Sequence, residues 1–362
     1  MERPRAELFN AGPLRAEEWP GRLAALWPRA PAVPACLVAG LTGDAVLIGR
    51  FQSAATALRD VPDRPAPGET GPSAALPIAR RATGGRALRL GDGCLAIALV
   101  LPRTGALLAD GRDVPAAKIV NRFVRPALGA LAAAGVSAGW FGRDFISASS
   151  RPVAHVSFDA GSDGSALIEV HLGVGRAIAL RESEPRWASL VELSPERFAT
   201  LPSLDNWLRH LRRGFEERLG AVLGEPQPAP PAAQPAWPPV DEELPPRAST
   251  LREVPIGHVE ARAELDELAG RRLTAAASGA DATAMNVAPG ARKVLGRVRL
   301  LGDFQADAAS VAALEASLRG CEATFEQVGA RVDALFGTHA RGTIVGLKTL
   351  APLAEAIVEA AG

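Results

Sequence analysis

Ala79-Arg80-Arg81-Ala82-Thr83-Gly84-Gly85-Arg86-Ala87-Leu88 is the most informative stretch of this sequence, because two arginines are followed by a turn with consecutive glycines. Glycines permit a tight turn whose backbone N–H groups can come close to an anion. Guanidinium groups bind phosphate or carboxylate oxygens through two parallel hydrogen bonds. The stretch therefore predicts an anion-binding turn, and a glycine-rich hairpin with solvent-facing arginines is the alternative.

The composition limits the size of the domains and the class of partner. A chain of 362 residues predicts two domains, and 48% hydrophobic residues exclude a disordered chain. The 40 basic and 40 acidic residues cancel, which argues against a nucleic-acid partner. Arginine supplies 37 of the 40 basic residues, and the three lysines are Lys118, Lys293 and Lys348.

The cysteines and the N-terminus indicate the compartment. The chain has three cysteines, an odd number, and they lie far apart in the sequence: Cys36, Cys94 and Cys321. Neither a disulfide framework nor a metal site is therefore expected. Charges and prolines stand where a signal peptide would need an apolar run. The longest apolar stretch, residues 94–102, is about half of what a membrane helix requires. We expect a cytoplasmic protein with no membrane segment and no bound metal.

A proline-rich segment divides the chain. Nine prolines fall between Glu225 and Arg247, and such a segment forms neither a helix nor a central strand. We therefore predict a first domain over residues 1–224, a stiff linker over 225–250 and a second domain over 251–362.

Apolar periodicity predicts α+β structure in both domains. Residues 35–48 contain two apolar runs around Thr42-Gly-Asp and predict a hairpin. Residues 94–101 predict a strand that is buried on both faces. Residues 116–134 predict an amphipathic helix with a kink at Pro126 and an end at Gly135. Further strands are expected at 153–158, 166–174, 256–265 and 293–301, and further helices at 204–223, 307–318, 324–335 and 351–361.

The glycine stretch resembles the Arg-Arg-x-Ser/Thr-Gly-Gly-Gly-Ala signature of the lipoate–protein ligases, in the biotin/lipoate protein ligase superfamily. Three further segments follow the order of that family: the strand Val46-Leu-Ile-Gly-Arg-Phe-Gln52, the turn Gly142-Arg143-Asp144 and the strand Leu167-Ile-Glu-Val-His-Leu172. In the second domain, Val254-Pro-Ile-Gly-His-Val-Glu260, Leu300-Leu-Gly-Asp-Phe304 and Leu314-Glu-x-x-Leu-x-Gly320 resemble the accessory C-terminal domain of these ligases. The resemblance implies a mixed, largely antiparallel sheet flanked by helices, followed by a small α+β accessory domain.

The resemblance also implies an activity. Family members use ATP with Mg to activate lipoate or octanoate, and transfer the acyl group to a lysine of a lipoyl domain or glycine-cleavage H protein. The balanced charge and the short apolar run lead us to expect neither a nucleic-acid partner nor a membrane partner. The positions that match the family's substrate- and adenylate-binding motifs are Arg50, Arg80, Arg81, Thr83, Gly84, Gly85, Arg86 and Asp92.

The sequence departs from the family at the catalytic lysine. The matching strand is Ser150-Arg-Pro-Val-Ala-His-Val-Ser157, with Pro152 at the lysine position. Proline has neither a charge nor an N–H to place at a developing charge. Arg151 and His155 are the neighbouring candidates, but strand alternation predicts that both face away from the side of Pro152. Lys118 is expected on a helix surface.

Two further departures leave the function open. Arg86 replaces the third glycine of the motif, and Cys94 replaces an asparagine. Cys94 is either a nucleophile or an unreactive core residue at the start of a buried strand. One hypothesis is an acyl-activating or acyl-transferring enzyme with an altered site. The other is a catalytically inactive protein of the same fold that binds a lipoyl domain or an acyl-adenylate.

Overall fold

The computed structural model describes residues 3–27, 32–58, 76–161, 163–180, 186–235, 244–266, 293–338 and 342–362. The chain divides into two compact units, residues 1–239 and residues 240–362. Each unit is described by itself.

An eight-stranded sheet organises the first unit, with strand order β11-β1-β2-β6-β10-β9-β8-β7. The pairs β11–β1 and β1–β2 are parallel, and every other neighbouring pair is antiparallel. The sheet is therefore mixed and largely antiparallel, as expected. The strands are β1 (Arg5–Arg15), β2 (Ala35–Thr42), β6 (Cys94–Leu101), β7 (Ala138–Trp140), β8 (Phe145–Ala148), β9 (Arg151–Ala160), β10 (Ala166–Gly173) and β11 (Val222–Pro228).

The continuous apolar run of β6 is explained by its place inside the sheet. All eight of its residues are buried, and its neighbours are β2 on one side and β10 on the other. One sheet face carries an apolar cluster that includes Leu37, Ala96 and Leu167. The opposite face, with Ile97 and Val170, meets the helices. The prediction of a strand buried on both faces is confirmed.

The predicted hairpin over residues 35–48 is wrong. Both strands exist, but β3 (Ala45–Ile48) leaves the large sheet and forms a second sheet with the order β4-β3-β5, where β4 is Ile78–Arg80 and β5 is Leu88–Leu90. The turn at Gly43, with φ of 61°, directs the chain away from β2. Both edges of β2 are already paired, with β1 and β6, so it has no edge for β3.

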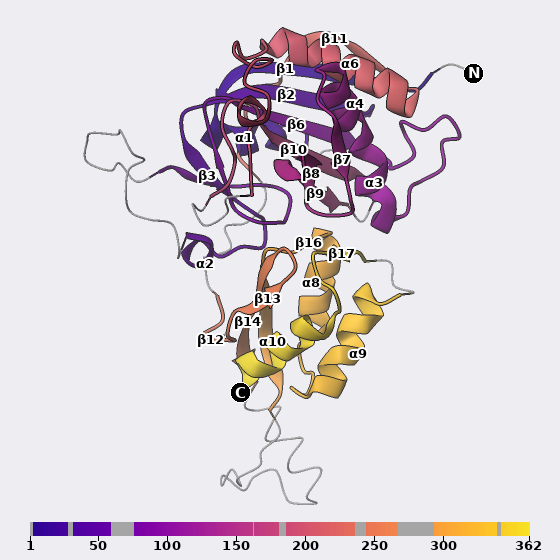
Figure 1. Ribbon diagram of the computed structural model, residues 1–362. Helices are drawn as coiled ribbons and strands as arrows, with labels where there is room; N and C mark the ends of the chain where they lie inside the picture. Colours follow the sequence, from indigo (N-terminus) through magenta and orange to yellow (C-terminus); the bar gives the residue numbers. More distant parts are fainter. Residues whose placement is uncertain are drawn as a thin grey trace, which may run out of the picture. The chain divides into compact units, whose positions relative to one another are not determined.

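Helices cover one face of the large sheet. The helix predicted at 116–134 is divided into η2 (Ala116–Lys118), α3 (Ile119–Phe123) and α4 (Arg125–Ala133). Pro126 lies in the first turn of α4, because proline lacks the N–H that a continuous helix would need. Figure 1 shows α4 beside α6 (Leu204–Leu219). Gly220, with φ of 68°, ends α6 four residues earlier than predicted at 223.

The N-terminal strand was not predicted, because Asn10, Gly12 and Pro13 interrupt its apolar pattern. It is nevertheless long, and a register shift between Asn10 and Pro13 accommodates the interruption. Its outer neighbour β11 carries Pro226 and Pro228, which an edge strand tolerates. The segment predicted as a linker thus begins inside a strand of the first unit, and residues 236–243 of it lie outside the described residues.

The second unit is α+β. A sheet is built around β14 (Gly257–Leu265), which pairs with β12 (Arg247–Ala248), β13 (Arg252–Val254) and β15 (Leu295–Gly302). The remaining elements are the short pair β16 (Gln305–Ala306) and β17 (Ile344–Val345), and the helices α8 (Ala308–Ser317), α9 (Phe325–Phe336) and α10 (Ala351–Ala361). The first unit also contains η1 (Ala16–Glu18), α1 (Trp19–Ala24), α2 (Ala54–Leu58) and α5 (Leu190–Leu193). None of these helices has the length and apolar character needed to cross a bilayer.

Helices α4 and α6 cross at two glycines. A Cβ on Gly129 would lie 2.7 Å from the Cα of Gly214, and a Cβ on Gly214 would lie 2.3 Å from the carbonyl oxygen of Pro126. We expect Gly214→Ala to lower the free energy of unfolding by about 1–3 kcal/mol, because backbone atoms cannot move aside as a flexible side chain would.

Gly329 of α9 is the matched control, because a Cβ there meets no atom within 4 Å. Gly329→Ala is expected to stabilise its helix by roughly 0.5–1 kcal/mol. Urea unfolding followed by circular dichroism measures both variants. Equal effects at the two positions would contradict the crossing as described.

Candidate functional site

The glycine turn, residues 81–86, connects β4 to β5 and packs against the end of β3. A Cβ on Gly49 would lie 2.1 Å from the carbonyl oxygen of Gly85, so only glycine fits at residue 49. The Arg81 N–H donates to Ile48 O and the Arg50 N–H donates to Thr83 O, both at 2.9 Å. The close approach of two glycine-containing backbones fixes the turn in place.

A row of polar side chains lies under this turn on the sheet face that also carries the apolar cluster. Register pairs Ser157 with Glu169 and His155 with His171 across β9 and β10. Alternation along both strands places these four side chains on one face. All four are fully buried, so their hydrogen-bond partners must be sought close by.

The Glu169 carboxylate is the centre of this polar row. One of its oxygens accepts a hydrogen bond from Trp19 Nε1 at 2.8 Å, and the other accepts one from the Thr83 hydroxyl at 2.5 Å. The Thr83 and Ser157 hydroxyl oxygens lie 2.7 Å apart. The carboxylate therefore connects α1, the glycine turn and β10.

Arg81 reaches the same row. Its side chain is fully buried, and Nη1 lies 3.1 Å from His155 Nδ1, while Nη2 donates to the carbonyl oxygen of Arg86 at 2.6 Å. Burial and the neighbouring Arg81 charge hold the pKa of His155 well below 6.5. Burial, followed by Arg81, lowers the pKa of His171 in the same way. Both histidines are therefore neutral at pH 7.

The other arginines near the turn are paired with carboxylates. Arg50 Nη1 lies 2.7 Å from an Asp159 oxygen, and Arg86 Nε lies 2.7 Å from an oxygen of the buried Asp144. The Arg86 guanidinium also lies 5.7 Å from the centroid of the Trp187 ring. These ion pairs use much of the positive charge that the motif was expected to offer to an adenylate.

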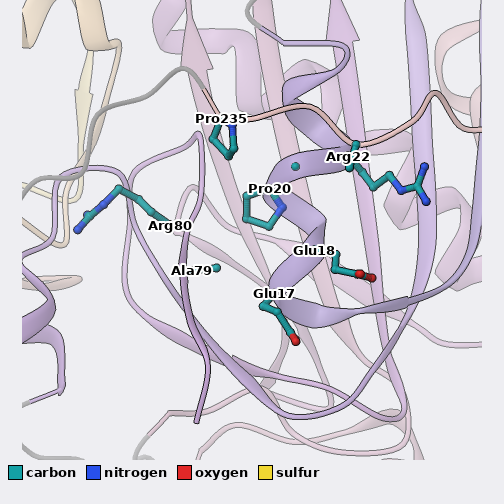
Figure 2. A pocket seen from close by; sticks show the side chains of 9 residues that line it. Glu17, Glu18, Pro20, Arg22, Ala79, Arg80 and Pro235 are labelled. Carbon is teal, nitrogen blue, oxygen red and sulfur yellow. The ribbon is translucent and has the colours of Figure 1, made fainter. Parts of the chain in front are cut away.

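Arg80 and Arg81 are adjacent but face opposite ways, because side chains alternate along a strand. Arg80 Nη1 donates to the carbonyl oxygens of Gly49 at 2.9 Å and of Gln52 at 2.6 Å, and so holds the segment after β3. Its side chain lines a hollow of about 440 Å³ whose other residues include Glu17, Glu18, Pro20, Arg22 and Pro235 (Figure 2). The structure therefore brings Arg81 into the polar row and leaves Arg80 outside it.

Asp92 and Cys94 lie at the other end of the short sheet. Register pairs Ala45 with Leu90 and Ile48 with Arg80, so Asp92 follows the end of β5 that is distant from the glycine turn. Its carboxylate accepts a hydrogen bond from the Gly43 N–H at 3.1 Å. Burial raises the pKa of the Cys94 thiol to about 11, which makes it an unreactive core thiol rather than a nucleophile.

A register shift in β9 changes the faces expected for Pro152 and His155. Phe145 is opposite His155 and Ser147 is opposite Pro152, so β9 has one more residue than β8 between these pairs. Because Phe145 and Ser147 share a face, His155 and Pro152 also share one. The expectation that His155 faces away from the side of Pro152 is therefore wrong, and the physical reason is the bulge.

Arg151, the second candidate, is held elsewhere. Its guanidinium donates to the carbonyl oxygens of Arg186 at 3.2 Å and Trp187 at 2.8 Å, and lies 3.4 Å from a Glu192 carboxylate oxygen. These contacts bind β9 to the segment 186–192. The Ala188 N–H adds a hydrogen bond to Pro152 O at 2.9 Å, so this segment is bound to the backbone at the position that the resemblance assigns to the lysine.

The described residues supply only part of what the resemblance implies for Mg-ATP. All three lysines of the chain are exposed. Within the described ranges, no group of three or more His, Cys, Asp or Glu side chains is placed to hold a metal ion. The arginines beside the turn are paired with Asp144 and Asp159. We therefore derive no step through ATP or magnesium.

The buried histidines predict a pH dependence of stability. The unfolded chain takes up protons below pH 6.5 that neutral His155 and His171 in the folded chain do not. With respect to these histidines, the free energy of unfolding should therefore be highest above pH 6.5 and decrease as the pH falls below this value. The decrease should be up to about 1.4 kcal/mol per pH unit for each histidine. Urea unfolding at pH 7.5 and 5.5 measures the decrease.

The double variant His155→Gln/His171→Gln should lose most of this dependence. His210→Gln is the control, because His210 is far less buried although its pKa is also lowered. A double variant that keeps the wild-type dependence would show that the two histidines are protonated in the folded protein.

Comparison with solved structures places this geometry in a known fold. No family model and no curated protein matches the sequence. The structure of P. falciparum LipL1 in complex with lipoate matches with a TM-score of 0.54 at 9% identity, over 91% of this chain and 95% of that one. A lipoate-protein ligase A bound with ATP matches at TM-score 0.46 and 17% identity, over 62% and 90%.

A third match is the bi-partite lipoate protein ligase from Thermoplasma acidophilum, solved in a study that also covers its lipoyl domain. Its TM-score is 0.46 at 16% identity, over 63% of this chain and 88% of that one. The resemblance drawn from the sequence motifs is confirmed at the level of the fold: this chain has the fold of the lipoate–protein ligases, as a divergent example.

Proposed function

We propose that this chain is a lipoate–protein ligase-like protein that transfers a lipoyl or octanoyl group to a lysine of a lipoyl-domain acceptor. The observation that carries the proposal is the position of Arg81. The glycine turn delivers this guanidinium, fully buried, to a polar row on the central sheet of a ligase fold. A fixed cation in an environment that excludes water stabilises a carboxylate or a developing oxyanion far better than one in solvent does.

The surroundings of the polar row suit an acyl chain. Trp19, Leu37, Ala96, Leu167 and Trp187 belong to the apolar cluster on the same sheet face. A medium-chain acyl group could bury its hydrocarbon against such side chains, at roughly 0.8 kcal/mol for each CH₂. Apolar walls around a few polar groups are typical of sites for amphiphilic small molecules.

A second function is favoured by a specific observation at Pro152. The family's lysine is absent there, and the 186–192 segment is hydrogen-bonded over that position. The corresponding candidate is a protein of the same fold that binds an acyl-adenylate or a lipoyl domain without turnover. It predicts that Pro152→Lys alone restores no activity, because the site differs from the family's at more than this one position.

The test supplies the purified chain with an unmodified lipoyl domain and either ATP with octanoate or preformed octanoyl-adenylate. Mass spectrometry of the lipoyl domain then detects one added octanoyl group. Arg81→Met is expected to lower the rate by about 10²–10³-fold, as loss of one oxyanion-stabilising group does in other enzymes. Arg112→Met, at an exposed position, should leave the rate unchanged.

The outcomes separate the two functions. Transfer from octanoyl-adenylate, with or without ATP-driven activation, supports the acyl-transfer proposal. Binding of octanoyl-adenylate without any transfer, measured by calorimetry, replaces it with the second function. Absence of binding to octanoate, lipoate and octanoyl-adenylate would overturn both, and circular dichroism of each variant excludes misfolding as the cause.

A further inference from the structure

The polar row contains hydrogen-bonding groups that no described residue satisfies. His155 Nε2 and both ring nitrogens of His171 have no hydrogen-bond partner within the described part of the chain, and both histidines are fully buried. A buried polar atom without a partner costs free energy comparable to a lost hydrogen bond. Each such atom needs an explanation, and a bound ligand or a role in a reaction is one of those recognised in proteins.

The tautomer of His155 follows from its contact with Arg81. A guanidinium N–H can only donate, so His155 Nδ1, 3.1 Å from Arg81 Nη1, must be the acceptor. Burial beside Arg81 keeps the ring neutral. Neutral imidazole carries one proton, which therefore lies on Nε2. Arg81 thus fixes Nε2–H as a hydrogen-bond donor that has no acceptor among the described residues.

The carboxylate of the row does not supply this acceptor. The Glu169 oxygens accept from Trp19 Nε1 and from the Thr83 hydroxyl, and His155 Nε2 has no hydrogen-bond partner among the described residues. Glu169 does not satisfy His171 either, because its Oε1 lies 3.8 Å from His171 Nε2. The ring centroids of His155 and His171 are 6.4 Å apart. The unmatched donor points to a ligand that brings a hydrogen-bond acceptor.

This donor lies on the strand face where the chemistry is expected. The bulge in β9 puts His155 on the same face as Pro152, which stands where the family has its lysine. Arg81 comes from the glycine turn and touches His155 directly. His155 Nε2–H is therefore a donor on the face where the lysine is missing, and Arg81 orients it.

We propose that His155 Nε2–H donates a hydrogen bond to the acyl carbonyl oxygen of the substrate, with Arg81 as the residue that positions it; this role rests on the proposed function. In the transfer, the acceptor amine attacks the acyl carbon, the C–N bond forms and the bond to the leaving group breaks. The amine proton departs with the leaving group or to solvent. His155 keeps its proton throughout and stabilises the negative charge that grows on the carbonyl oxygen.

Two conservative variants of His155 distinguish the roles of its two ring nitrogens. Asparagine places an acceptor near the Nδ1 position for Arg81 but has no donor at the Nε2 position. Glutamine reaches the Nε2 position with its amide N–H. Affinity is measured by calorimetry with two ligands: a non-hydrolysable octanoyl-adenylate analogue, and the same analogue with its carbonyl group replaced by CH₂.

The wild type should bind the carbonyl ligand about tenfold or more tightly than the CH₂ ligand, as loss of one buried hydrogen bond predicts. His155→Asn should remove this preference and His155→Gln should retain most of it. In the wild type with ¹⁵N-labelled histidine, the His155 ring should be the Nε2–H tautomer. Its ¹⁵N shift should change with the carbonyl ligand and not with the CH₂ ligand.

The role of His155 would be overturned if the wild type bound the two ligands with equal affinity. It would also be overturned if the ¹⁵N shift of His155 were the same with both ligands. Neither result would contradict the proposed function. Failure of the wild type to bind either ligand would overturn the proposed function itself. The labelled wild type needs no substitution, so the test holds even if a variant fails to fold.

Discussion

The buried carboxylate of Glu169 is the interaction on which the arrangement of the first unit depends. Trp19 Nε1 from α1 and the Thr83 hydroxyl from the glycine turn both donate to it, and β10 carries it at the centre of the large sheet. A buried charge without such partners would cost several kcal/mol. The N-terminal helix, the turn and the sheet are therefore tied to one another through a single carboxylate, and the turn cannot move from the sheet without exposing or unpairing it.

Strand alternation then decides what each arginine of the motif can do. Arg80 and Arg81 are neighbours, yet Arg80 holds the backbone after β3 and lines an outer hollow, while Arg81 enters the buried row. Arg50 and Arg86 are paired with Asp159 and Asp144. Arg81 differs from these arginines because it contacts a neutral side chain of the polar row, that of His155. The proposed chemistry therefore centres on Arg81.

Local sequence patterns predicted most helices and strands correctly. They failed where the pairing of strands that are distant in sequence determines the structure. The uniform apolar run of β6 indicated a strand buried on both faces, because its eight residues have the length of a strand rather than of a helix. The hairpin at 35–48 failed because both edges of β2 are taken by β1 and β6, which a local pattern does not contain. Asp92 was grouped with the glycine turn by motif order, yet the short sheet places it at the opposite end of β3.

The sequence by itself determined the ligase resemblance, the α+β class and the presence of proline at the position that the resemblance assigns to the catalytic lysine, because these depend on residue identity and order. Only the tertiary structure decided what stands beside Pro152. One extra residue in β9 turns His155 to the same face, and register then places it opposite His171 and within reach of Arg81. A bulge depends on the pairing of two strands rather than on the residues of one, so strand alternation alone gave the wrong face.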